Sequence, residues 1–480
     1  MWTLTPGEVG RLTFAVDSVA LHFAFLTILV GLGVLVFALR AFGGAGQEGD
    51  AASGNPRRRF LLTAVPTLGA VLGAVFAGDL LTLFVFFEVL ALLGFLLVRQ
   101  GEGAREAAIR YFWWMLVGGL LLLGGILLHA GGSSGPGSAL LILGFGVKAG
   151  MLPVHGWLPA AYSKAPAPAS ALLSGVMGKV GIYGIFRVLS DPSTMEALHA
   201  TVLTLGLTAA AYGALRALAQ SDAKRLLAWS SVSQIGVILT GLGVGAWEGS
   251  LAHVLTHGSA KGVLFLAVGA VALRCGTVQL PRLGGLWRAM PVTFALSLLA
   301  SLALVGFPFL RASGGKAEIH HALEGLPAAE AAFFLASAGT VAVVLKLIAD
   351  VFLGPVVSPA SSKVAEGRGR APLALGLAIA ALPLLFPAMP ADLPYFMATL
   401  GGGAGLHFLA RRWSAIRLPL RLPRIGRPGG LPRPALPHFP RAPIGLEEGL
   451  RRRLDRYTRA LSHNLALLFL VLMAALLLLA

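Results

Sequence analysis

Long apolar stretches recur along the whole of this 480-residue sequence. A helix that crosses a membrane needs about 20 mostly apolar residues, and the sequence holds about fourteen stretches of that kind. They lie at residues 19–41, 60–77, 79–98, 110–130, 138–160, 170–189, 198–219, 226–245, 249–274, 290–325, 328–353, 371–388, 394–410 and 464–480. Open sheet edges cannot lie in hydrocarbon, so these spans are expected to be helical. The sequence therefore predicts an all-α polytopic membrane protein, in agreement with a charged fraction of only 12%.

Lysine and arginine are distributed unevenly among the loops between these spans. The loops expected on one face carry them, at residues 57–59, 99–105, 164, 224–225, 282–288 and 363–370. The loops expected on the other face nearly lack them, at residues 131–137, 191–197, 245–248 and 390–392. The positive-inside rule then places the basic loops in the cytoplasm and both termini outside. We expect an integral protein of the prokaryotic inner (plasma) membrane in this orientation.

Two of the spans contain residues that interrupt helices. The fifth span contains Pro153 and Pro159, and the tenth contains Gly306, Pro308 and Gly315. Such breaks at membrane depth are tolerated where the freed backbone faces protein or a water-filled cavity, and in transporters they point to an ion path. We expect two broken helices, with simple packing kinks as the alternative.

The C-terminal region differs from the rest in composition. Residues 411–459 hold 13 of the arginines, and eight prolines lie between Pro419 and Pro443. This composition predicts a transmembrane domain at 1–410, a basic cytoplasmic strap with an amphipathic helix at 411–463, and a C-terminal transmembrane helix at 464–480. A basic stretch beside a membrane favours anionic lipid, and not nucleic acid, as its partner.

Cysteine usage and the absence of redox motifs limit the chemistry of the chain. Cys275 is the only cysteine, which excludes a disulfide framework and a cysteine-ligated cluster. The sequence also lacks a C-x-x-C-H motif and any quinone or flavin signature. We expect no cofactor and no metal, with any redox chemistry carried out by partner subunits.

An acidic and a basic residue lie deep in two neighbouring spans. Glu88 is in the middle of the third span, and Lys148 is near the centre of the fifth. An ionisable side chain at that depth costs about 2.5–3.5 kcal/mol on insertion scales, so it is a functional candidate by default. We expect Glu88 and Lys148 to interact, as a pair that holds or releases a proton when one partner moves. A static structural ion pair is the alternative.

Further titratable residues follow in later spans. Lys179 is expected at mid-membrane in the sixth span, and His253, His257 and Lys261 recur at every fourth position of the ninth, on one helix face. Because histidine exchanges protons near neutral pH, the stripe indicates a chain of relay stations. Metal binding, haem ligation and hydrogen-bonded core histidines are the alternatives for the two histidines, and a snorkelling side chain is the alternative for Lys179.

Lys316 follows the break in the tenth span, where a half-helix would expose unpaired amides. Lys346 and Asp350 are four residues apart near the cytoplasmic end of the eleventh span. That spacing is typical of a local, snorkelling ion pair with a supporting role.

Three segments carry a resemblance to a known family. Gly78–Glu88, Gly146–Pro166 and Ser221–Gln234 resemble the fifth-helix motif, the broken seventh helix and the loop into helix ten of one family of membrane subunits. These antiporter-like subunits are shared by respiratory complex I, the Mrp-type multi-subunit Na⁺/H⁺ antiporters and the membrane-bound hydrogenases. The resemblance covers residues 14–354.

The resemblance implies an inverted-repeat bundle and a role for each titratable residue. Glu88 and Lys148 would be the coupled pair, and Lys316 would exchange protons with the outside. Between them would lie the central relay, formed by Lys179, His253, His257 and Lys261. The motifs also contain Asp79, His155 and Lys224, which are expected to support the relay.

The chain also departs from the family pattern. It opens at what resembles the third family helix, so it is expected to be shortened at its N-terminus. The second break, Gly306–Lys316, departs from the usual motif, and the Arg/Pro-rich tail is unusual.

The function expected from these observations is proton translocation, or Na⁺/H⁺ exchange, by one membrane subunit of a multi-subunit respiratory-type complex. The partners would be other membrane subunits, and the complex would be a dehydrogenase, a hydrogenase or an antiporter. Two alternatives remain: a stand-alone secondary transporter, and a non-conducting structural subunit.

Overall fold

The structure is a computed structural model, and it describes residues 11–42, 55–307, 311–355, 370–385 and 393–415. The predicted C-terminal helix at 464–480 lies outside these ranges, and so does nearly all of the predicted strap. The division of the chain into a transmembrane domain, a strap and a final helix therefore stays a prediction.

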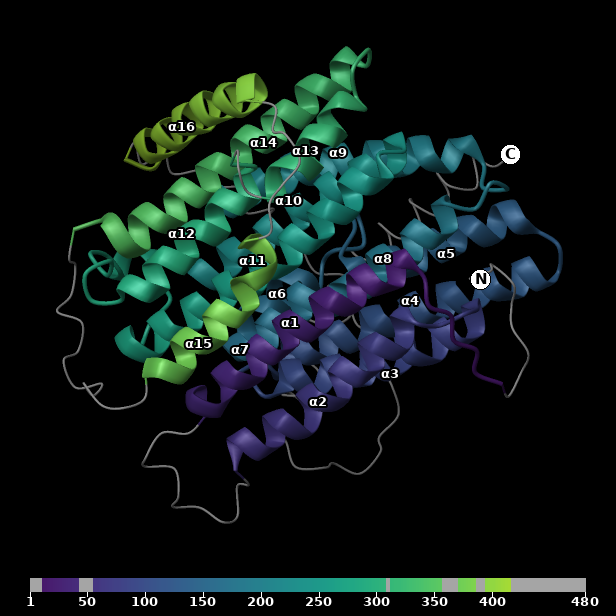
Figure 1. The fold of residues 1–480 in the computed structure, drawn as a ribbon, viewed down its shortest axis with the longest axis horizontal. Coiled ribbons are helices and arrows are strands. Elements are labelled where there is room, and N and C mark those ends of the chain that lie inside the picture. The colour runs from purple at the N-terminus through teal and green to yellow at the C-terminus, as the bar shows by residue number, and fades with distance from the viewer. Residues whose placement is uncertain (1–10, 43–54, 308–310, 356–369, 386–392, 416–480) are drawn as a thin grey trace, which may run out of the picture. The chain divides into compact units, whose positions relative to one another are not determined.

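The regular elements in the described ranges are helices (Figure 1). They are α1 Ser18–Ala41, α2 Pro56–Val75, α3 Leu80–Arg99, α4 Arg105–Ala130, α5 Ser134–Ala149, α6 Leu158–Lys164, α7 Ala167–Leu172, α8 Gly178–Leu189, α9 Glu196–Leu218, α10 Ala223–Val244, α11 Trp247–Cys275, α12 Pro291–Val305, α13 Arg311–His321, α14 Pro327–Ile348, α15 Arg370–Ala381 and α16 Leu393–Ala415. Two π-helical turns, η1 Leu173–Met177 and η3 Ala349–Leu353, and two 3₁₀ turns, η2 Leu280–Arg282 and η4 Leu382–Leu385, complete them. Isolated β-bridges join Phe14 to Ala77 and Asp222 to Gln279.

Nine helices in the described part of the chain are long and apolar enough to cross a membrane. They are α1, α2, α3, α4, the continuous run Ala167–Leu189, α9, α10, α11 and the run Pro327–Leu353. The all-helical, polytopic fold class is thus confirmed. The larger count of about fourteen spans stays a prediction.

Capping residues explain why several helices begin and end where they do. Asp17, Asp79 and Asp222 each precede a helix, and the side chain of each accepts a hydrogen bond from a backbone N–H in the first turn. A side-chain acceptor at this position satisfies a donor that the helix itself leaves unpaired. The chain leaves α10 at Gly245 and α11 at Gly276, with φ of +86° and +67°, which glycine adopts without strain.

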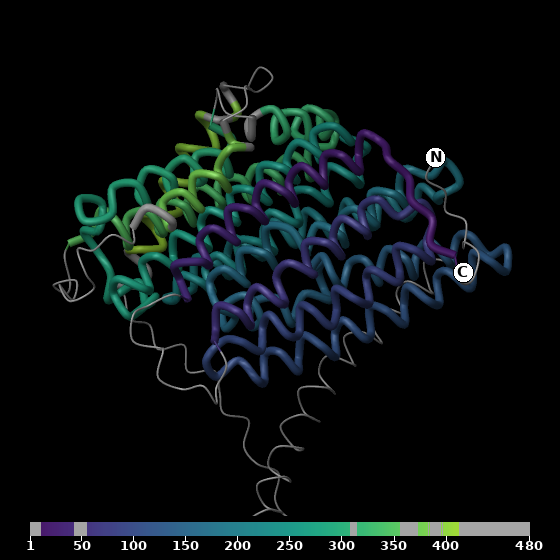
Figure 2. Tube along the Cα trace, turned by 60° about the horizontal axis from the view of Figure 1, so that its bottom comes forward, coloured from purple at the N-terminus to yellow at the C-terminus, as the bar shows by residue number. Residues whose placement is uncertain are grey.

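Three elements form the interior of the bundle. The run Ala167–Leu189, α10 and α11 are almost entirely buried along their apolar lengths, whereas α2, α3, α4 and α9 are buried over less than half of theirs. Figure 2 shows the long helices running alongside one another, and α1 packs against α15 although the two are far apart in sequence. Residues on the buried elements are therefore shielded from lipid by the rest of the bundle.

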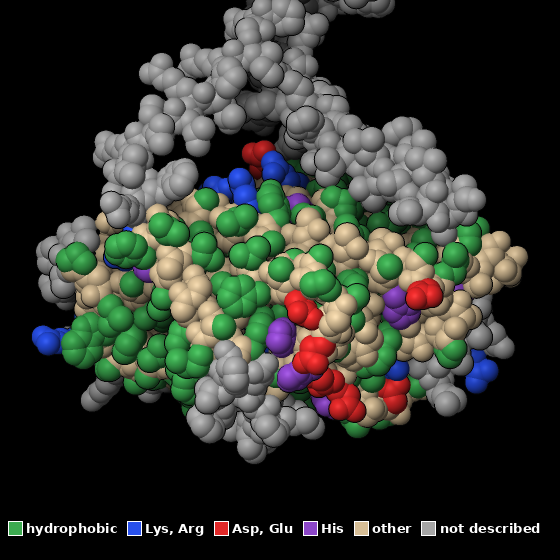
Figure 3. All heavy atoms as spheres, turned by 90° about the horizontal axis from the view of Figure 1, so that it is seen from above, with side chains coloured by type: hydrophobic (Ala, Val, Ile, Leu, Met, Phe, Trp, Pro, Cys, Tyr) green, Lys and Arg blue, Asp and Glu red, His purple; other side chains and the backbone are tan. Residues whose placement is uncertain are grey.

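The outward faces of the long helices are apolar. Leu62, Leu120, Leu127 and Leu215 are each more than 60% exposed. Figure 3 shows one such face, on which hydrophobic side chains cover wide areas while acidic and histidine side chains gather in one region. Exposed apolar surface of this extent is rare on proteins that work in water, and it suits contact with lipid.

Two helix ends lie close to the titratable residues. Helix α5 ends at Ala149, where Gly150 has a φ of +79°, and α6 begins at Leu158. Helix α12 ends at Val305, and α13 begins at Arg311. The prediction that α5 with α6, and α12 with α13, each form one broken membrane span stays a prediction.

Candidate functional site

The four lysines of the predicted relay are all buried in the described part of the chain. Lys148, Lys179 and Lys316 are 2% exposed, and Lys261 is fully buried. An ammonium group inside an apolar bundle is costly unless polar atoms surround it. The contacts of each lysine therefore decide what the site can do.

Lys148 lies on α5 and contacts the backbone of α3. Its Nζ donates a hydrogen bond of 3.0 Å to the Phe87 carbonyl and lies 4.0 Å from the centre of the Phe87 ring. The neighbouring residue, Glu88, is within electrostatic reach of Lys148. Its Oε1 atom is buried and accepts no hydrogen bond from the described residues. Within the described part of the chain the two side chains thus interact electrostatically without forming a hydrogen-bonded ion pair.

Lys179 lies at the start of α8, directly after the π-helical turn η1. Its Nζ donates a hydrogen bond of 2.6 Å to the Ser174 carbonyl, which belongs to that turn. The Ser174 hydroxyl lies 3.0 Å from the Ser231 hydroxyl on α10. A π-helical turn frees backbone groups from the regular helix ladder and often occurs at functional sites. Here it supplies the carbonyl that holds the ammonium group.

Glycines bring α8 against α5, which carries Lys148. A Cβ atom added at Gly181 would overlap the backbone of α5 at Phe145 and Ala149. Small residues at such a contact let two helix backbones approach closely. Lys148 and Lys179 therefore lie on two helices that pack directly against each other.

Lys261 is held by α10. Its Nζ donates a hydrogen bond of 3.1 Å to the Leu227 carbonyl and another to the Ser230 hydroxyl. The Ser230 hydroxyl in turn donates to the Leu227 carbonyl at 3.0 Å. The ammonium group is thus solvated by one carbonyl and one hydroxyl of the facing helix.

The two histidines of α11 are fully buried and stacked. Their ring centres are 6.4 Å apart, with 13° between the ring planes. His253 Nε2 lies 2.9 Å from the Gln234 side-chain oxygen on α10. Neither ring nitrogen of His257 has a hydrogen-bond partner among the described residues. Buried polar atoms of this kind normally pair with protein or ordered water, so water is the partner expected for His257.

Lys316 approaches the same histidines from α13. Gly315 and Gly249 bring α13 and α11 together, since a Cβ added at Gly315 would lie 2.7 Å from the Gly249 carbonyl oxygen. Lys316 and Lys179 both act electrostatically on His253 and His257. The Lys316 Nζ atom is buried and has no partner among the described residues.

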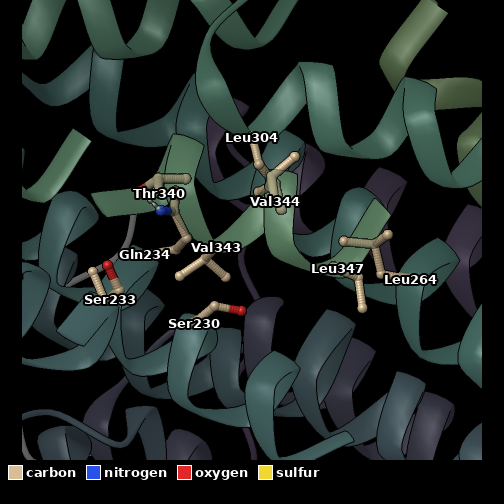
Figure 4. Close-up of a pocket in the computed structure, with 10 residues that line it drawn as sticks. Ser230, Ser233, Gln234, Leu264, Leu304, Thr340, Val343, Val344 and Leu347 are labelled. Carbon is tan, nitrogen blue, oxygen red and sulfur yellow. Dashed lines mark hydrogen bonds between the residues drawn. The ribbon is translucent and has the colours of Figure 1, made fainter. Parts of the chain in front are cut away.

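A small internal cavity adjoins this cluster on the α10 side. It is lined by side chains of five helices, Ala214, Ser230, Ser233, Gln234, Leu264, Leu304, Thr340, Val343, Val344 and Leu347 (Figure 4). Its volume is about 10 Å³, which is close to the space that one water molecule needs. The cavity thus adds a second place for water beside Ser230 and Gln234.

The five supporting residues lie outside the central cluster. Asp79 caps α3 and accepts hydrogen bonds from the hydroxyls of Thr82 and Thr13. Lys224, at the start of α10, donates a hydrogen bond to the Ala165 carbonyl. These contacts fix helix ends, which is a structural role.

The remaining supporting residues lie near other helix ends. The His155 ring packs edge-on against Tyr212 and Trp229, with ring centres 5.9 and 5.5 Å away. Lys346 donates hydrogen bonds of 2.6 and 2.8 Å to the Leu218 and Gln220 carbonyls at the end of α9. Asp350 lies in the π-helical turn η3.

Several polar residues of the cluster were missed by the sequence analysis. They are Ser174, Ser230, Ser231, Gln234 and Thr340. The run Ser230–Gln234 enters the sequence prediction only as part of the Ser221–Gln234 motif. A polar run inside an apolar span is, however, itself a signal of a buried polar site. Thr340 gave no signal, because one threonine in an apolar helix ordinarily bonds to its own backbone.

Comparison with known proteins places the chain in a family. Residues 130–346 match the family described as NADH:quinone oxidoreductase/Mrp antiporter, TM. NADH-quinone oxidoreductase subunit N of Desulforudis audaxviator (strain MP104C) is 33% identical over 348 residues, which are 64% of this chain and 68% of that protein. The chain belongs to this family and is an integral membrane protein. The resemblance drawn from the motifs is thereby confirmed.

Two further similarities extend the comparison. Hydrogenase-4 component B of Escherichia coli (strain K12) is 34% identical over 347 residues, which are 63% of this chain and 50% of that protein. The chain thus matches about half the length of this relative. A chain of the membrane-bound sulfane sulfur reductase, an archaeal respiratory membrane complex, superposes with a TM-score of 0.68 at 28% identity, covering 79% of this chain and 66% of that one.

Proposed function

We propose that this protein is a proton-translocating or Na⁺/H⁺-exchanging membrane subunit of a multi-subunit respiratory-type complex. The observation that carries the proposal is the cluster of buried lysines and histidines on α8, α11 and α13, where Lys316 Nζ and both His257 ring nitrogens have no hydrogen-bond partner among the residues that the structure describes. Ionisable residues inside a bundle are rare and costly, and they mark ion paths and proton relays. Family membership supports the same function.

The proposed route follows helices that touch each other. A proton passes from Glu88 and Lys148 to Lys179, then along Lys261, His257 and His253, and reaches Lys316. Water beside His257 and Lys316 would bridge the steps, since those polar atoms need partners. An imidazole ring accepts a proton at one ring nitrogen and releases one from the other, so each histidine is able to pass a proton on.

The Glu88–Lys148 pair would act as the switch of this route. The Phe87 carbonyl and ring hold the Lys148 ammonium group, while the Glu88 Oε1 atom has no hydrogen-bond partner in the described part of the chain. The carboxylate is therefore able to approach or withdraw without breaking a hydrogen bond. Each position changes how strongly Lys148 holds its proton, because a nearby negative charge stabilises the ammonium form.

The setting of the protein completes the proposal. The partners are other membrane subunits, as they are for the relatives named above, and anionic lipid contacts the basic region 411–463. The chain lies in a prokaryotic inner membrane, with its basic loops in the cytoplasm and both termini outside. About fourteen spans, two of them broken, form the complete bundle.

Proton flux in vesicles tests the proposed function. The complex that co-purifies with the chain is reconstituted into lipid vesicles. Transport is driven by the electron transfer of the complex or by an ion gradient, and proton uptake is followed with a pH-sensitive dye. Lys261→Ala and Lys179→Ala should each lower the flux by about a hundredfold or more, as loss of a proton-transfer group does elsewhere. Arg110→Ala is the matched control, because Arg110 is a partly exposed residue of α4 whose side chain pairs with Glu106 at 3.5 Å.

Normal flux in both lysine variants, in an intact complex, would overturn the proposal. That outcome would favour a structural subunit that conducts no ions.

A further inference from the structure

Gln234 lies between a relay histidine and an anchoring hydroxyl. Its side-chain nitrogen is 2.8 Å from Thr340 Oγ1 on α14, and its side-chain oxygen is 2.9 Å from His253 Nε2 on α11. Gln234 and His253 are almost fully buried, and Thr340 is 5% exposed. Three helices thus meet in one chain of hydrogen bonds.

The hydroxyl of Thr340 determines which atoms donate and which accept along this series of hydrogen bonds. Thr340 Oγ1 donates a hydrogen bond of 3.0 Å to the Ala336 carbonyl, one turn earlier in α14. A hydroxyl has one proton and two lone pairs, so the lone pairs are left for Gln234. Only the NH₂ end of the amide is able to donate to them, which turns the amide oxygen toward His253.

The orientation of the amide then determines the form of the histidine. An amide oxygen only accepts, so the nitrogen that faces it must carry a proton. A neutral imidazole with its proton on Nε2 has its lone pair on Nδ1. His253 Nδ1 is buried and has no partner among the described residues, so it is open to an incoming proton.

We propose that Gln234, anchored by Thr340, is a positioning residue that fixes neutral His253 as the Nε2–H tautomer, so that relayed protons enter and leave at Nδ1. The inference deepens the proposed function, and its consequence for transport rests on it. The charged and titratable neighbours of His253 are His257 on its own helix, Lys179 on α8 and Lys316 on α13. None of the three is hydrogen-bonded to Nε2, which leaves Gln234 to decide the tautomer.

The cavity beside the anchor makes the inference testable by a small change. Gln234 and Thr340 both line it, and Figure 4 shows the Gln234 amide reaching toward Thr340. Once a methyl group replaces the hydroxyl of Thr340, the amide loses the acceptor that orients it, and the cavity beside Gln234 leaves space for it to turn. Thr340→Val removes the hydroxyl at nearly constant volume, whereas Thr340→Ser keeps it.

Nitrogen-15 NMR of histidine-labelled protein in the intact complex reads the tautomer directly. The His253 signals are identified by their loss in His253→Gln. We expect a protonated Nε2 and an unprotonated Nδ1 in the wild type and in Thr340→Ser, and a mixture of tautomers in Thr340→Val. Thr240→Val is the matched control, because Thr240 is a buried threonine of α10 whose hydroxyl, among the residues described, donates to Gly236 of its own helix.

Proton flux measured on the same variants connects the tautomer to transport. Thr340→Val should lower the flux about two- to tenfold, the effect of losing one oriented hydrogen bond. Thr340→Ser and Thr240→Val should transport at the wild-type rate. A wild-type His253 protonated on Nδ1, or a Thr340→Val variant with unchanged tautomer and flux, would overturn the inference. If the wild-type complex moves no protons, the proposed function fails, while the NMR signals still decide the tautomer.

Discussion

At the scale of single residues, the Lys148 ammonium group shows how the bundle tolerates a buried charge. The Phe87 carbonyl accepts its hydrogen bond, and the Phe87 ring faces it at 4.0 Å. A carbonyl and an aromatic face both stabilise a cation. Lys148 therefore keeps partners when the Glu88 carboxylate moves, as a switch requires.

Gly119 on α4 offers a test of that switch. A Cβ added there would overlap the Glu88 carboxylate, so Gly119→Ala should displace the side chain toward a new position. Because only the end of a flexible side chain must move, we expect normal folding. Misplacing a reacting group by about 1 Å can cost a hundredfold, so we expect proton flux in the reconstituted complex to fall about ten- to a hundredfold.

Gly124→Ala on the same helix is the matched control for Gly119→Ala. Its added Cβ would meet only the Leu140 side chain, at 3.3 Å. Equal flux in the two alanine variants would show that the position of the Glu88 carboxylate does not control transport.

Charge and apolar context made the principal site residues predictable. Glu88, Lys148, Lys179 and Lys261 stand out because a charged residue inside an apolar span costs several kcal/mol, roughly 2.5–3.5 on insertion scales. Gln234 and Thr340 do not stand out, because their importance depends on which helix faces them. The contact between Lys148 and the Phe87 carbonyl likewise arises only when α3 and α5 pack together.

At the scale of helices, α9 and α10 meet through glycine. A Cβ added at Gly206 would lie 2.5 Å from the Thr240 amide nitrogen, and one added at Gly236 would lie 2.6 Å from the Gly206 carbonyl oxygen. These neighbours are backbone atoms, which cannot rotate away. The close contact holds α10, and with it Ser230 and Gln234, against the rest of the bundle.

Gly236→Ala should therefore push the two helices apart. We expect a loss of about 1–3 kcal/mol in the free energy of unfolding, the usual cost of overpacking. The thermal unfolding midpoint of the purified protein, followed by tryptophan fluorescence, should fall accordingly.

Gly69→Ala is the control for this helix contact. Gly69 is an exposed residue of α2 with no atom within 4 Å of an added Cβ. Alanine favours a helix more than glycine does, by up to about 1 kcal/mol, so this variant should be as stable as the wild type or more so. A Gly236→Ala protein that matches Gly69→Ala in stability would show that the α9–α10 contact is less tight than the structure indicates.

Helix ends were harder to anticipate from the sequence than helix centres. The expected span at 249–274 lies within α11 at Trp247–Cys275, because its apolar run is long and is bounded by glycine. By contrast, the π-helical turn Leu173–Met177 interrupts a continuous apolar segment. No residue type marks such a turn, since it depends on how the helix packs against its neighbours.

At the scale of the whole molecule, the described bundle keeps Lys179, His253, His257 and Lys261 on its most buried elements. Lys179 lies on α8, His253 and Lys261 lie on α11, and their solvating groups come from η1 and α10. These elements are almost entirely buried inside the bundle, which shields the cluster from lipid. Water is then the expected partner of the buried polar atoms that have none from protein.

A density map of the purified complex, at a resolution that shows ordered water, is the most direct test of this arrangement. We predict water molecules within hydrogen-bond distance of Lys316 Nζ and of both His257 ring nitrogens, linked to the surroundings of Lys179 and Lys261. Dry apolar packing between these side chains, or lysines that face lipid on separate surfaces, would contradict a connected path for protons.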